Sequence, residues 1–133
     1  MKRALWIVPG LLALSVVIGY CAEDVSSIDD IMTRAHKNKT GLRDQIATEL
    51  KKSTPDWADV QKKTKEFVGL AGSLTKFDPP KGDKGSWKKL ADAYTADVKS
   101  LDAAAGKKDQ PTAVKAVEKL KTGCTPCHDA HRE

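Results

Sequence analysis

Residues 110–132 read QPTAVKAVEKLKTGCTPCHDAHR. Gln110-Pro111 can begin a helix, because proline fits the first helical position. Five side chains then recur every three or four residues, at Val114, Val117, Leu120, Cys124 and His128. This spacing places them on one face of a helix. We therefore predict a last helix whose buried face carries a cysteine and a histidine.

Three further helices are predicted upstream of this stretch. The first starts at Ser26 or Ser27, either of which can act as its N-cap. The polar residues around Asn38 and Gly41 interrupt its apolar stripe, which predicts a kink or local unwinding there. The stripe itself repeats every three or four residues, at Val25, Ile28, Ile31 or Met32, Ala35, Leu42, Ile46 and Leu50.

The middle of the chain predicts a second and a third helix around one loop. The second helix opens at Thr54-Pro55, a good N-cap followed by proline. Two prolines and two glycines make residues 77–85 (FDPPKGDKG) a loop. The third helix begins after Ser86 and ends at Gly106, a natural C-cap. We expect an all-α fold, an antiparallel up-down-up-down four-helix bundle, whose few aromatic residues leave room for a large apolar cofactor.

The first residues have the pattern of a secretory signal. Lys2 and Arg3 precede an apolar run over residues 5–18, which is short for a membrane-spanning helix. We expect a signal peptide over 1–22, export to the periplasm and one mature domain over 23–133; an uncleaved anchor is the alternative. Cys21 lies at this boundary, and the chain would be held at a membrane only if Cys21 were lipidated.

The charge balance of the mature chain is weakly basic. Without Lys2 and Arg3, 21 basic residues face 18 acidic ones, which gives a net charge of +3. A nucleic-acid-binding domain of this size usually carries a larger, clustered positive charge. We therefore expect no nucleic acid as a partner.

The segment Cys124-Thr125-Pro126-Cys127-His128 has the spacing C-x-x-C-H. Two thiols at this spacing can add to the two vinyl groups of one haem, and the adjacent imidazole then reaches the iron from the same face. We expect one covalent haem c, with Cys124 and Cys127 as thioethers and His128 as proximal iron ligand. A Cys124–Cys127 dithiol or disulfide remains an alternative. So does a zinc site that adds His131, although the adjacent Cys127 and His128 fit one tetrahedral ion poorly.

The ending CTPCHDAHR, residues 124–132, resembles the C-x-x-C-H-x-x-x-R ending of class II cytochromes c, the cytochrome c′ group. Trp87, just after the loop, is similar to a tryptophan that opens the third helix in that family. The resemblance covers nearly the whole mature chain, more loosely in its first helix. It implies that Arg132 lies beside the proximal imidazole. His131 is expected to be exposed to solvent.

The resemblance also implies that a first-helix residue covers the distal face of the haem, and the register points to Met32. His36, one turn later on the same face, is the alternative ligand, or a propionate contact, and a core role for Met32 also stays open. We expect a low-spin haem that exchanges single electrons with redox partner proteins, and no enzymatic activity. The alternatives are a five-coordinate cytochrome c′ that binds nitric oxide or carbon monoxide, and a haem-free helical interaction module. Family members often form homodimers through their first two helices.

Overall fold

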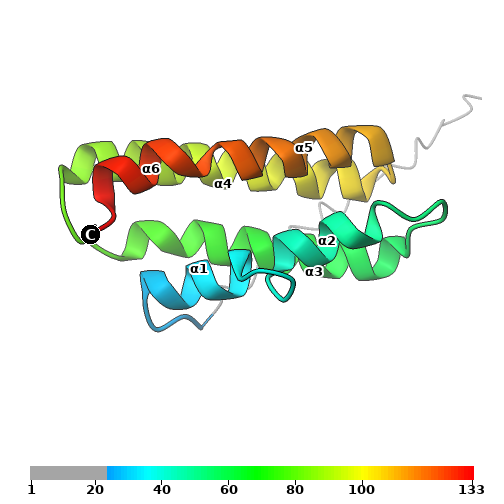
Figure 1. Cartoon of the computed structure of the whole chain (residues 1–133), viewed down its shortest axis with the longest axis horizontal. Helices are drawn as coiled ribbons and strands as arrows, with labels where there is room; N and C mark the ends of the chain where they lie inside the picture. The colour runs from blue at the N-terminus through cyan, green and yellow to red at the C-terminus, as the bar shows by residue number, and fades with distance from the viewer. Residues whose placement is uncertain (1–23) are drawn as a thin grey trace, which may run out of the picture.

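The computed structural model describes residues 24–133, so the predicted signal peptide and Cys21 lie outside the described residues. Every regular element between 24 and 133 is a helix, which confirms the all-α prediction (Figure 1). Within that range no helix is long and apolar enough to cross a membrane. The elements are, in chain order, α1 (Ile28–His36), α2 (Leu42–Glu49), α3 (Trp57–Ser73), the short 3-10 helix η1 (Leu74–Lys76), α4 (Lys84–Gly106), α5 (Gln110–Thr122) and α6 (Cys124–His131).

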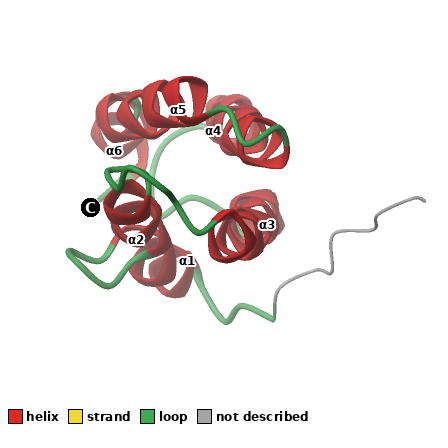
Figure 2. Cartoon of the chain, turned by 90° about the vertical axis from the view of Figure 1, so that its right-hand side faces the viewer, coloured by secondary structure: helices red, strands yellow, loops and turns green. Residues whose placement is uncertain are grey.

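The helices pack along one another in two groups (Figures 1 and 2). The long helices α3 and α4 make the largest contact, α5 and α6 lie along α4, and α1 and α2 lie along α3. Apolar side chains from all of these helices except α6 meet in one core, which excludes water and supplies the main stabilisation. Its fully buried large members include Ile31, Ile46, Leu50, Val60, Phe67, Leu70, Val98, Leu101 and Leu120.

The predicted interruption of the first helix is confirmed as a complete break between α1 and α2. Lys39 takes a positive φ of 65° in the connecting turn. The Gly41 N–H donates to the Lys37 carbonyl at 2.7 Å, and a Cβ on Gly41 would lie 2.6 Å from the Lys37 nitrogen. Only glycine fits a turn this tight, so α1 is a short helix of nine residues.

Two predicted helix starts are wrong by a few residues, because aspartates act as the caps. Asp56 accepts from the N–H groups of Ala58 and Asp59, so α3 begins at Trp57 and not at Thr54-Pro55. Asp83 accepts from the Ser86 N–H at 2.7 Å, so α4 begins at Lys84, before Ser86. A short acidic side chain is among the best N-caps, and each of these precedes its helix directly.

The ends of the helices around residue 106 and residue 123 also differ from expectation. Gly106 is the last helical residue and Lys107 is the C-cap of α4. The predicted start at Gln110 is confirmed, with Asp109 as N-cap. The last helix is divided at Gly123 into α5 and α6. Val114 was expected in the core but is 39% exposed.

Candidate functional site

Helix α6 carries the C-x-x-C-H residues. Cys124 is its first residue, and its thiol donates to the Leu120 carbonyl at 3.3 Å. Pro126 lies in the first turn, where a missing N–H removes no intrahelical hydrogen bond. Both cysteines are free thiols and half-buried. The short helix thus holds two thiols and the His128 imidazole at one wall of the helical core.

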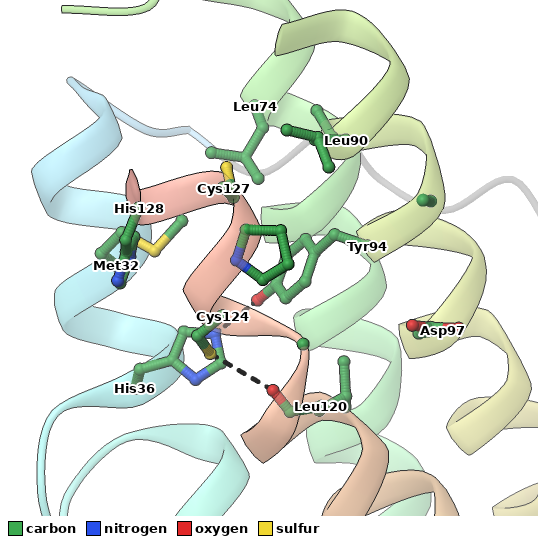
Figure 3. A pocket seen from close by; sticks show the side chains of 14 residues that line it. Met32, His36, Leu74, Leu90, Tyr94, Asp97, Leu120, Cys124, Cys127 and His128 are labelled. Carbon is green, nitrogen blue, oxygen red and sulfur yellow. Dashed lines mark hydrogen bonds between the residues drawn. The ribbon is translucent and has the colours of Figure 1, made fainter. Parts of the chain in front are cut away.

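Cys124, Cys127 and His128 line a mainly apolar cavity (Figure 3). Its space free of protein atoms is about 650 Å³, including its open mouth. Helix α1 contributes Met32 and His36 to the opposite wall, so residues from the first and the last helix of the described chain meet here. The other walls are mostly apolar and come from η1, α4 and α5, with Leu74, Leu90, Ala91, Ala93, Tyr94, Asp97 and Leu120.

A second cavity shares three lining residues with the first. Met32, Cys127 and His128 line both cavities. The second cavity is also mainly apolar, and Arg132 lies at its edge together with Trp87. The Met32 thioether, the Cys127 thiol and the His128 imidazole are therefore polarisable groups that both cavities share.

His36 and Tyr94 form a polar pair within the first cavity. The His36 Nε2 lies 2.7 Å from the Tyr94 hydroxyl, and both rings contact Phe67 edge-on at centroid distances of 5.6 and 6.2 Å. The pKa of His36 is lowered to about 4, mainly by burial and also by the charges of Arg43 and His128, against a smaller opposing effect of Asp44. Burial raises the pKa of Tyr94 above its usual range. At neutral pH both rings are therefore uncharged.

One nitrogen of this pair has no partner. The His36 Nδ1 is buried and makes no hydrogen bond. An unpaired buried polar atom costs about 1–3 kcal/mol, and a neutral imidazole nitrogen is a good iron ligand or hydrogen-bond acceptor. Because Nε2 is bound to Tyr94, Nδ1 is the nitrogen of His36 that lacks a hydrogen bond.

The cavity keeps the thiol of Cys127 protonated. Burial raises the pKa of Cys127, and the neighbouring Cys124 raises it further. Two reduced thiols three positions apart, with an imidazole next in sequence and a thioether across the cavity, fit a covalently held haem. The apolar lining fits a large flat macrocycle.

His131 contradicts its predicted exposure, since only 2% of it is exposed. Its Nδ1 lies 2.9 Å from the Lys81 carbonyl and its Nε2 lies 3.2 Å from the Ser86 hydroxyl. A zinc site with Cys124, Cys127 and His128 would require one of these nitrogens. The spacing 124, 127 and 131 could have revealed this burial, because it places His131 on the same helix face as the cysteines.

Arg132 follows α6 as its C-cap residue, and its N–H donates to the His128 carbonyl at 3.0 Å. Its side chain is exposed at the edge of the second cavity, which His128 also lines. Among residues 24–133, no cluster of three or more histidine, cysteine or acidic side chains is arranged for a metal ion. Comparison of the chain with models of known families, with curated proteins and with solved structures finds no match.

Proposed function

We propose that this chain is an exported monohaem c-type cytochrome that carries single electrons. In this proposal α1 with α2, α3, α4, and α5 with α6 are the four helices of a bundle of the class II type. Cys124 and Cys127 hold one haem c, His128 is its proximal ligand and Met32 its distal ligand. Its partners are other redox proteins of the periplasm.

One observation carries the proposal: all three residues of the C-x-x-C-H motif line a single apolar cavity that Met32 also lines. A structural disulfide gives no reason for the adjacent histidine, and an interaction module gives no reason for the cavity. A thioether and an imidazole on facing helices are a ligand pair typical of electron-transfer haems.

The residues of the chain have separate tasks in this mechanism. When bound, haem supplies the reversible one-electron couple of its iron. The two thiols of α6 would attach it covalently, and the His128 imidazole and the Met32 thioether would be the ligands of its iron. Apolar residues such as Leu74 and Leu90 would exclude water. Because water is excluded, the surroundings would reorganise less when the charge of the iron changes, which suits electron transfer.

Covalent attachment is tested by haem staining after denaturing electrophoresis. The wild-type chain, exported in cells that carry the haem-attachment machinery, should stain. The double variant Cys124→Ala, Cys127→Ala should not stain, whereas Thr125→Ala, an exposed change inside the motif, should stain as strongly as wild type. An unstained wild-type protein would refute the proposal and favour a haem-free helical module.

The distal ligand is tested by the absorption spectrum of the ferric protein. Wild type should be low-spin, with the weak far-red band of sulfur-to-iron ligation. Met32→Ala should remove this band, admit water or leave the iron high-spin, and accelerate carbon monoxide binding to the reduced protein. Thr33→Ala, an exposed neighbour on α1, should change none of these.

His36→Ala separates the remaining alternatives. With Met32 as ligand, His36→Ala should leave the far-red band in place. If His36→Ala instead causes the change of spin state, His36 is the ligand, and the reduction potential should be lower because imidazole favours ferric iron more than a thioether does. A wild type that is already high-spin, and insensitive to both changes, would favour the five-coordinate form that binds nitric oxide or carbon monoxide.

A further inference from the structure

Helix α6 has few interactions that stabilise its position. It spans eight residues, its N-cap Gly123 offers no side chain, and His131 is its one buried residue. Isolated helices of this length are unstable in water. Besides the half-buried Cys127, which packs against the core, the buried His131 is therefore the main contact that can hold α6 in position.

His131 is bound on three sides by the segment between α3 and α4 and by the start of α4. The Lys81 carbonyl can only accept, so the His131 Nδ1 donates to it at 2.9 Å. The Ser86 hydroxyl, 3.2 Å from Nε2, can then donate to the other nitrogen. The ring also packs edge-on against Trp87 at a centroid distance of 5.5 Å.

The connection itself is shaped to receive this histidine. Gly82 has a φ of +85°, and a Cβ there would lie 2.9 Å from the His131 Nδ1 and 2.8 Å from the Ala130 carbonyl oxygen. Trp87 is fixed in turn, because its indole N–H donates to the Phe77 carbonyl at 2.9 Å. Figure 1 shows the chain end of α6 beside this connection.

We propose that His131 is a positioning residue: by binding the 77–83 connection it locks α6, and with it the His128 imidazole, against the start of α4. His128 lies one helical turn before His131, and both line the second cavity. A rotation of α6 would therefore move both imidazoles together. Only the effect on the iron rests on the proposed function; the locking of α6 does not.

The first test measures hydrogen exchange of the backbone amides of α6 in the full chain. His131→Leu fills the buried position with an apolar side chain but removes both hydrogen bonds, and should accelerate exchange in 124–131 about tenfold or more. His131→Asn keeps a donor near the Nδ1 position and should restore most of the protection. Asp129→Ala, an exposed change on the same helix, should exchange like wild type.

The second test measures the reduction potential of the haem-loaded protein in the same variants. His131→Leu should shift the potential away from wild type, while His131→Asn and Asp129→Ala should stay close to it. Unchanged α6 exchange and potential in His131→Leu would overturn the proposal. So would equal acceleration of exchange in α3 and α4 without rescue by His131→Asn, because that pattern indicates general destabilisation.

The two proposals fail in different ways. A wild-type protein that takes up no haem refutes the cytochrome assignment, and the exchange measurement still decides whether His131 locks α6. A haem-containing protein whose α6 exchange is indifferent to His131→Leu refutes the lock and leaves the cytochrome assignment standing.

Discussion

Lowering the pH should destabilise the haem-free chain through His36. Folding lowers the pKa of His36 from 6.5 to about 4, mainly because the ring is buried and also because Arg43 and His128 are near. The folded chain therefore binds fewer protons than the unfolded chain between these values. The stability contributed by the neutral ring is present above pH 6.5 and is lost as the pH falls towards 4.

The magnitude follows from the gap between the two pKa values. Each unit of difference corresponds to about 1.4 kcal/mol, so the gap from 6.5 to about 4 gives an upper value of about 3 kcal/mol. Residual solvent around the half-buried ring reduces the expected loss to about 2–3 kcal/mol between pH 7 and pH 4. This is a large share of the stability of a small helical domain.

The assay compares urea unfolding of two chains from pH 4 to pH 7.5, followed by far-ultraviolet circular dichroism. Both carry Cys124→Ala and Cys127→Ala, so that no haem is attached, and one also carries His36→Gln. Glutamine does not titrate, so the free energy of unfolding of the chain with His36→Gln should fall less steeply with decreasing pH. Carboxylates with lowered pKa values on which His36 has no effect, such as Asp109, contribute equally to both chains and cancel. Parallel pH profiles for the two chains would refute the reasoning.

The local backbone features give two further predictions. Gly82→Ala should lower the free energy of unfolding by about 1–3 kcal/mol, because φ is +85° and the new methyl group would press on its neighbours. Gly72→Ala, inside α3 with open space around it, should raise the free energy of unfolding by up to about 1 kcal/mol. Urea unfolding that ranks the two variants in the opposite order would contradict this prediction. Asp56→Ala should cost about 1 kcal/mol as a lost N-cap while Thr54→Ala should cost almost nothing, and equal thermal midpoints for the two variants would show that Asp56 does not cap α3.

The helices could be predicted from the sequence because their apolar residues recur with helical spacing. Ile31, Ala35, Leu42, Ile46 and Leu50 are all buried as the stripe implied. Helix starts were less predictable, since several polar residues near each start could serve as caps and tertiary packing selects among them. The local sequence pattern does not determine which of several neighbouring residues acts as the cap.

The candidate site was predictable only as far as its residues share a local motif. Cys124, Cys127 and His128 are consecutive or nearly so, and one helix places them together. The Tyr94–His36 contact and the burial of His131 join residues more than forty positions apart. Such contacts depend on how α4 packs on α1 and α6, and the spacing of residues within one helix does not reveal this packing.

The break at Gly123 and the short length of α1 have a consequence for the order of folding. The long helices α3, α4 and α5 are neighbours in sequence and can pair early, since short loops close at low entropic cost. Met32 and His128 stand at opposite ends of the described chain, about 100 residues apart, so their contact closes a much longer loop and is expected to form after that pairing. We therefore expect the cavity to be completed last. If haem is attached as proposed, the thiols of α6 would be open to the attaching enzyme before α1 arrives, and late closure would let covalent modification precede burial.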